Sequence, residues 1–158
     1  FFKHLTDIRN RNLFQFSPSE VQGFSLVGKN LDSLFFQKND STGQWGSPLN
    51  GATCTNEQVQ NWLSQVASNR GLPFADFFDE SHADDTFYAQ INLEFNAPKD
   101  PLTLKIFHMH PIHVPEEMPA QRPDRRELAP FAIQSSQNPL NYFALSDTAL
   151  LRQICHPF

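Results

Sequence analysis

Three histidines stand close together in the sequence, at a spacing that could hold a metal ion. His108 and His110 are two positions apart, so on a β-strand both side chains lie on the same side. Neutral imidazoles are common ligands of zinc and copper, and His113 or a carboxylate of Glu116 or Glu117 could complete the coordination shell. The cluster His108, His110 and His113 is therefore a candidate zinc or copper site.

A second interpretation of these histidines involves no metal. Their face continues the apolar face of a predicted strand that includes Leu102, Leu104 and Ile106. On this interpretation, the histidines end a buried strand and hydrogen-bond to the proline-rich chain that follows. Metal binding is thus an alternative hypothesis for the function, and adding zinc or copper would distinguish the two.

Acidic side chains gather in a second segment, and carboxylate oxygens suit calcium. The segment lacks the spacing and the terminal glutamate of an EF-hand loop. A solvated loop between strands is the interpretation that we prefer. The residues are Asp76, Asp79, Glu80, Asp84 and Asp85.

The sequence contains no complete motif of a known enzyme class. The stretch from Gly23 to Gly28 lacks the second glycine of a nucleophile elbow, because Val27 stands there. Cys54 and Cys155 have no CxxC spacing for zinc or redox chemistry, and we expect them to be unpaired because they flank the ends of two different helices. The sequence therefore predicts a protein that is not an enzyme and holds no cofactor other than the candidate metal.

The length and net charge of the chain limit the kinds of protein that it can be. The chain has 158 residues, enough for one domain with its own core, and 16 of them are Phe. A net charge of -5 provides no basic face, so nucleic acid is not an expected partner. No apolar run has the length of a membrane span. Because the chain begins with Phe1 rather than Met, we expect it to be processed or trimmed, so that any N-terminal signal or anchor would already be missing.

The elements that must position these residues follow from periodicity. Thr55 and Gln58 predict a capping box at the start of a helix that runs to about residue 70, and Gly71 is its expected C-cap. Its apolar stripe is Val59, Trp62, Leu63 and Val66, whereas Gln60, Asn61, Ser64 and Gln65 are expected to face away.

Short strands account for most of the remaining chain. Residues 87–95 alternate strictly and are expected to form a hairpin with 102–106. Further strands are expected at 21–27, 34–36, 131–133 and 142–145, a short piece at Trp45, and a closing helix after Ser146 and Asp147. The predicted class is α+β: a mainly antiparallel sheet packed against one amphipathic helix, with a second helix at the termini.

The predicted α+β domain spans residues 17–158 and includes a proline-rich excursion at 111–130, whereas residues 1–16 precede it. Residues 1–16 are expected to form an N-terminal helix or the closing helix of a preceding unit, because residues 1–5 match residues 150–154 in character. This echo suggests a tandem repeat. Residues 111–130 carry five prolines and are expected to form an excursion that contacts a partner and tolerates shortening.

Features at both ends of the chain form a recognisable combination. They are the Arg9–Phe14 link, the Ser17–Val21 strand start, Trp45, Pro48 and Ala52 before the predicted helix, and the ending 142–147 with Leu150 and Leu151. In this combination the chain resembles a bacterial family described as domain of unknown function 4340. The resemblance covers residues 9–72 and the termini, whereas the histidines and prolines of 108–130 depart from it.

The resemblance implies a location and a partner rather than a reaction. Members are bacterial, carry an N-terminal membrane anchor, repeat this unit in tandem and accompany ABC-type transporters, including those linked to gliding motility. Together with the lack of a catalytic motif and a surface rich in Asn, Gln, Ser and Thr, the resemblance predicts a non-enzymatic envelope module, extracytoplasmic and anchored to the inner membrane, that contacts transporter subunits or sibling repeats. No catalytic residues can be transferred from the family.

Overall fold

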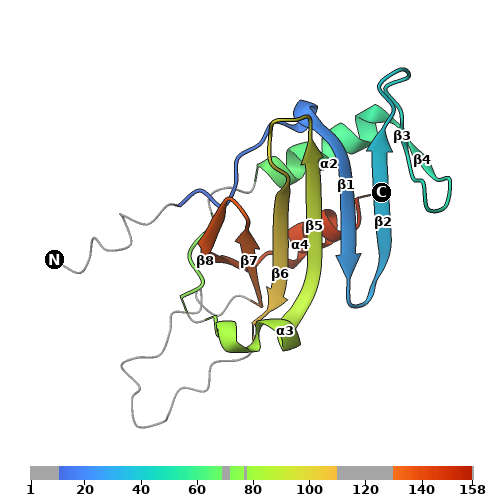
Figure 1. Ribbon diagram of the computed structural model, residues 1–158. Coiled ribbons are helices and arrows are strands. Elements are labelled where there is room, and N and C mark those ends of the chain that lie inside the picture. The colour runs from blue at the N-terminus through green and yellow to red at the C-terminus, as the bar shows by residue number, and fades with distance from the viewer. Residues whose placement is uncertain (1–10, 69–71, 77, 110–129, 158) are drawn as a thin grey trace, which may run out of the picture.

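The computed structural model describes residues 11–68, 72–76, 78–109 and 130–157, and their dominant feature is one antiparallel sheet (Figure 1). Eight strands follow the order β4-β3-β2-β1-β5-β6-β7-β8. They are β1 (Val21–Gly28), β2 (Leu31–Lys38), β3 (Trp45–Gly46), β4 (Thr53–Cys54), β5 (Phe87–Phe95), β6 (Leu102–His108), β7 (Phe131–Ser135) and β8 (Asn138–Leu145).

The helices among the described residues are short. They are η2 (Pro18–Glu20), α2 (Asn56–Ala67), η3 (Glu80–His82), α3 (Ala83–Thr86) and α4 (Thr148–Cys155). The α+β prediction is therefore wrong, and the chain is a β-rich fold. The physical reason is that most consecutive strands, such as β1 with β2, β5 with β6 and β7 with β8, pair as antiparallel neighbours through short links that have no room for a helix.

The predicted N-terminal helix is wrong for the part of 1–16 that the structure describes. Residues 11–16 are irregular. The Gln15 N–H donates to Gln137 Oε1 at 2.7 Å, and Asn138 Nδ2 donates to the Asn12 carbonyl at 2.9 Å. Side chains of the β7–β8 turn thus satisfy this backbone, which buries Leu13 and Phe14 in the core without helical hydrogen bonds.

The predicted capping box of α2 is confirmed. The Gln58 N–H donates to Thr55 Oγ1 at 3.2 Å, and the Thr55 N–H donates to Gln58 Oε1 at 3.1 Å. The predicted apolar stripe, Val59, Trp62, Leu63 and Val66, is buried. The helix ends earlier than expected, at Ala67 with Ser68 as its C-cap, and Gly71 lies outside the described residues.

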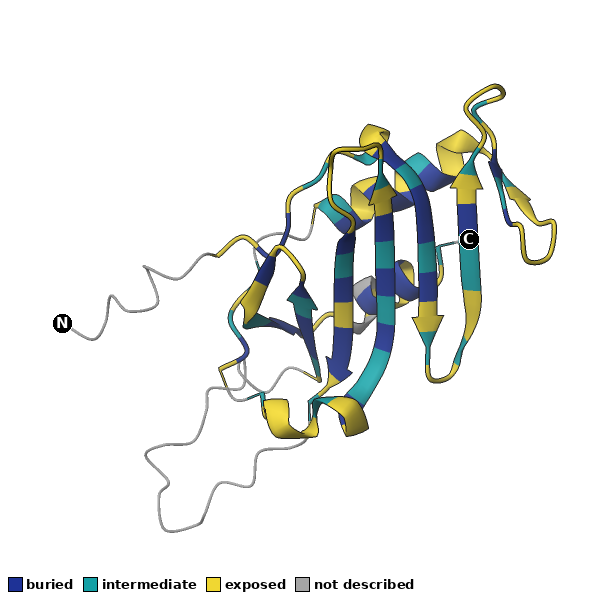
Figure 2. Cartoon of the chain, viewed as in Figure 1, coloured by how far each residue is buried: buried dark blue, intermediate teal, exposed yellow. Residues whose placement is uncertain are grey.

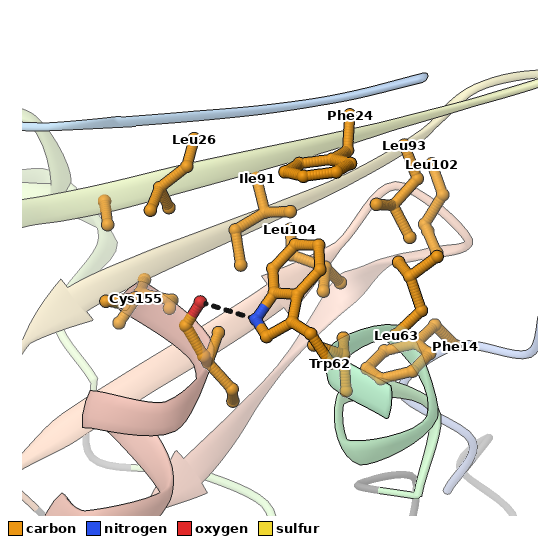
Figure 3. Close-up of a cluster of buried hydrophobic side chains, with 14 of the residues drawn as sticks. Phe14, Phe24, Leu26, Trp62, Leu63, Ile91, Leu93, Leu102, Leu104 and Cys155 are labelled. Atoms are coloured by element: carbon orange, nitrogen blue, oxygen red, sulfur yellow. Dashed lines mark hydrogen bonds between the residues drawn. The ribbon is translucent and has the colours of Figure 1, made fainter. Parts of the chain in front are cut away.

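Helices α2 and α4 cover the same face of the sheet, and aromatic rings fill the space between them and the strands (Figure 3). The Phe24 ring lies 4.7 Å from that of Trp62 and 5.4 Å from that of Phe36, centroid to centroid. The Trp62 indole N–H donates to the Ile154 carbonyl at 3.2 Å. This bond joins α2 to the last turn of α4 inside the core.

The predicted hairpin of β5 and β6 is confirmed, and it shows how the two faces of the sheet differ. Ala89, Ile91 and Leu93 are fully buried. The intervening positions 90, 92 and 94 lie on the opposite face and remain partly or fully exposed, as the banding in Figure 2 shows. We name the face away from α2 and α4 the open face.

The segment between α2 and β5 partly covers the open face. Its residues pair with β8: the Ala75 N–H donates to the Tyr142 carbonyl at 2.8 Å, and the Ala144 N–H donates to the Pro73 carbonyl at 2.7 Å. The Phe78 ring then lies 5.2 Å from Phe107 and 4.5 Å from Tyr142. One end of the open face is therefore apolar and covered.

Several predictions concern residues outside the described part of the chain. These are the echo at 1–5, His110, His113, and the proline-rich excursion except Pro130, whose carbonyl accepts from the Met109 N–H at 2.9 Å. Within the described ranges, no helix has the length and apolar character needed to cross a membrane.

Candidate functional site

Polar side chains occupy the uncovered part of the open face. Cross-strand registry places them in two adjacent rows: Ser25 opposite Asn92 opposite Thr103, and Gln90 opposite Lys105 opposite Gln134. Strands β1, β5, β6 and β7 each contribute, and we name these six residues the polar patch. They lie together because each is at an outward position of its strand.

Hydrogen bonds hold much of the polar patch in place. Asn92 Oδ1 accepts from Thr103 Oγ1 at 2.9 Å and from Gln90 Nε2 at 3.0 Å. Asn92 Nδ2 donates to Ser25 Oγ at 3.1 Å. Gln134 Nε2 donates to the Pro139 carbonyl at 2.7 Å. The side chains are thus ordered before any ligand arrives, which lowers the entropy that binding would cost.

Two hollows lie along the second row of the polar patch, and Gln90, Lys105 and Gln134 line both of them. We name the pair the trough. One hollow, of about 410 Å³, is walled by Thr103, Ser135, Ser136 and Pro139. The other, of about 400 Å³, is walled by Ala83, Asp84, Phe87, Phe107 and Tyr142. The trough therefore has a hydroxyl-rich end and an aromatic end.

Lys105 is the cation of the trough. Its side chain is exposed, and among the described residues no carboxylate oxygen lies within 4.0 Å of its ammonium nitrogen. Its cross-strand neighbours, Gln90 and Gln134, are neutral. Burial raises the pKa of Tyr142, and the charge of Glu80 raises it further, so this hydroxyl stays protonated at neutral pH.

The structure places one of the three candidate metal ligands. His108 ends β6 with an exposed side chain, and its ring lies 4.9 Å from those of Tyr88 and Phe131. His110 and His113 lie outside the described residues, as do Glu116 and Glu117. Within the part of the chain that is described, no three His, Cys, Asp or Glu side chains group around a possible metal position. Zinc or copper binding stays a prediction.

The acidic segment forms local turn structure instead of a shared ligand set. Asp79 caps η3 by accepting from the Ser81 N–H at 3.0 Å and from the Ser81 hydroxyl at 2.6 Å. The other carboxylate oxygen of Asp79, Oδ2, lies 2.9 Å from His82 Nδ1. The hydrogen bonds from Ser81, followed by the contact with His82, lower the pKa of Asp79. These contacts favour a solvated local structure over calcium binding, but Glu80, Asp84 and Asp85 lie in η3 and α3 rather than in the predicted loop.

The prediction of unpaired cysteines is confirmed. Cys54 and Cys155 are both free thiols. Burial raises the pKa of Cys155 to about 11, so its thiol is protonated at neutral pH and unsuited to nucleophilic attack. Its neighbour His156 is exposed, whereas Cys155 is 2% exposed, so the two side chains do not share an environment.

Sequence reasoning missed the polar patch. The alternation of residues 87–95 correctly indicates which side chains point outward, but an outward polar side chain is ordinarily only a solvated one. The available signal was the group of amides and a hydroxyl at outward positions of the two hairpin strands, Gln90, Asn92 and Thr103, beside the single cation Lys105.

Comparison of the chain with protein-family models, with curated proteins and with solved structures gives no match. The resemblance to domain of unknown function 4340 therefore remains an expectation that rests on the residues quoted for it.

Proposed function

We propose that this chain is a contact module of the bacterial cell envelope that acts by binding a protein partner rather than by catalysis. The partner is expected to be a subunit of an ABC-type transport system or a sibling repeat, in a protein anchored to the inner membrane. Envelope, anchor and partner class are implied by the family resemblance. The contact surface is inferred from the fold.

One observation carries the choice of surface. The sheet buries one face under α2 and α4, while on the other face no described residue covers the polar patch. The trough opens beside the patch and ends at the rings of Phe107 and Tyr142, which Phe78 partly covers. Interfaces between proteins combine satisfied polar groups with aromatic side chains, and the trough offers both. Because the patch is already hydrogen-bonded, a partner would meet a pre-organised surface.

The test is photo-crosslinking in the host cell. Pro139 suits the photoreactive residue p-benzoylphenylalanine, because its side chain is exposed beside the trough and only its backbone carbonyl bonds to Gln134. Asp84, exposed at the other end of the trough, is a second position. We expect irradiation to join both variants to the same protein, identified by mass spectrometry as an envelope or transport component.

A matched control uses the opposite side of the molecule. Asn61 is exposed on α2, away from the open face, and replacing it with the same photoreactive residue should give none of that adduct. The proposal is wrong if positions 139 and 84 yield no protein adduct, or if position 61 yields the same one equally well.

A further inference from the structure

We propose that the trough receives an extended peptide segment of the partner protein, lying along β6 with an Asp or Glu carboxylate on Lys105. This inference rests on the proposed function and specifies the chemistry of its partner. The argument comes from charge, hydrogen-bonding capacity and shape.

Charge points to a carboxylate. Lys105 is flanked along β6 by Thr103 and Phe107 and across the sheet by Gln90 and Gln134, and all four are neutral. The ion pairs of Asp79 with His82 and of Glu20 with Lys99 lie elsewhere in the described chain. Asp84 lines the aromatic end of the trough but forms no ion pair with Lys105, so the ammonium group lacks an ion-pair partner within the described chain. A partner carboxylate would supply one.

Hydrogen-bonding capacity agrees with this choice. The Gln90 amide NH₂ carries two hydrogens, and its bond to Asn92 uses one of them. The Gln134 amide donates to the Pro139 carbonyl and also contacts the Tyr142 hydroxyl. The second hydrogen of Gln90 and the ammonium group of Lys105 are therefore the donors that face a ligand. A carboxylate offers about four lone-pair sites and accepts from several donors at once.

Shape indicates an extended segment. The trough follows β6 from Thr103 to Phe107, a span of about 13 Å, which is the length of roughly four extended residues. A peptide there would place a polar residue among the hydroxyls at one end and an apolar residue against the rings of Phe87, Phe107 and Tyr142 at the other. Asp84 at the aromatic end disfavours a second acidic residue there.

Two crosslinks made in the same cells test the inference. A carbodiimide joins an amine to a carboxylate in direct contact, with loss of water and no spacer. We expect peptide mass spectrometry to show an amide between Lys105 Nζ and an Asp or Glu of the partner. The photo-adduct from position 139 reports binding independently of that amide.

Matched variants separate charge from structure. Lys105→Gln should lower the photo-adduct yield about two- to fivefold, the range expected for an exposed ion pair. Lys105→Arg should keep the photo-adduct, because the charge remains, but lose the carbodiimide amide. Lys29→Gln, which removes an exposed lysine from the β1–β2 turn, should change neither.

The possible outcomes distinguish a failure of the proposed function from a failure of the carboxylate inference. Absence of the photo-adduct from the chain that keeps Lys105 and carries the photoreactive residue at position 139 overturns the proposed function itself. A photo-adduct that persists unchanged in Lys105→Gln overturns only the carboxylate inference, and so does a Lys105 amide to a carboxylate of the same chain. Circular dichroism spectra are recorded for each variant. If a variant's spectrum matches that of the parent, misfolding is excluded as the cause of a lower photo-adduct yield.

Discussion

Individual side chains of α2 contribute very differently to stability, although the helix is regular. Leu63 is fully buried and Asn61 is exposed. Gln60 is intermediate: the sequence places it on the solvent side, yet its amide donates to the Pro18 carbonyl at 3.2 Å. Gln60 thus lies off the buried stripe as predicted, but η2 packs against that side of the helix, so its side chain is only partly exposed.

Substitutions at these three positions should differ in a fixed order. Leu63→Ala should lower the free energy of unfolding by about 2–5 kcal/mol, through lost transfer energy and a cavity. Gln60→Ala should cost about 0.5–1.5 kcal/mol for its hydrogen bond, and Asn61→Ala should stay within about 0.5 kcal/mol. Urea unfolding measures all three, and equal losses at 61 and 63 would contradict the assigned helix face.

The thiol of Cys155 should make the fold sensitive to alkali. Burial raises its pKa from 9.0 to about 11 in the folded chain. Between these values the unfolded chain releases the thiol proton and the folded chain keeps it, so stability falls as pH rises from 9 to 11. Unfolding free energies across this window should decline less steeply for Cys155→Ala than for the parent. Parallel slopes would argue against a buried thiol.

Zinc should separate the two interpretations of the histidine cluster. If His108 is a ligand together with His110 and His113, stoichiometric zinc should raise the melting temperature of the parent chain, and His108→Ala should abolish the shift. If the ring only packs between Tyr88 and Phe131, both proteins should melt at temperatures independent of zinc.

At the scale of elements, α2 and α4 depend on each other. The bond from the Trp62 indole to the Ile154 carbonyl satisfies a group at the end of α4, where carbonyls have no partner within the helix. Leu151, Ile154 and Cys155 of α4 pack into the same core. A short helix of this kind is held by tertiary contacts more than by its own propensity.

Removing that one bond should weaken the attachment of α4. Trp62→Phe keeps an aromatic ring but leaves the buried Ile154 carbonyl without its donor, which costs about 1–3 kcal/mol. Amide hydrogen exchange in α4 should accelerate more than exchange in β5. Equal acceleration in both elements would mean that α4 and the sheet unfold together.

At the scale of the whole molecule, the sheet is uneven in strength. Its centre is built from long strands that pair on both edges, β1, β5 and β6, whereas β3 and β4 have two residues each. The apolar side chains of the long strands also form most of the core. Local stability should therefore decrease from the centre toward β4.

Hydrogen exchange should show this gradient directly. Backbone amides of β5 and β6 should exchange only through global unfolding, whereas those of β3 and β4 should exchange through cheaper local opening. Mass spectrometry of peptides from each region measures the difference. Protection of β3 and β4 as high as that of β5 would show that the sheet opens as one unit.

The sequence alone determined the features that depend on neighbours a few positions away. The capping box needs residues three apart, and the buried stripe of α2 repeats every three to four residues. The alternation of 87–95 identifies one buried face, and the short link after it predicts the hairpin with β6. Such patterns can be read locally because helix and strand each impose a fixed side-chain period.

Only the tertiary structure decided which distant segments meet. The strand at 21–28 lies between β2 and β5, and residues 73–75 pair with β8 almost 70 positions later. No local period encodes those partners, since many pairings would bury the same apolar faces and only the whole core selects one. The polar patch exists because of that choice: four strands from separate parts of the chain bring Ser25, Gln90, Lys105 and Gln134 to one face.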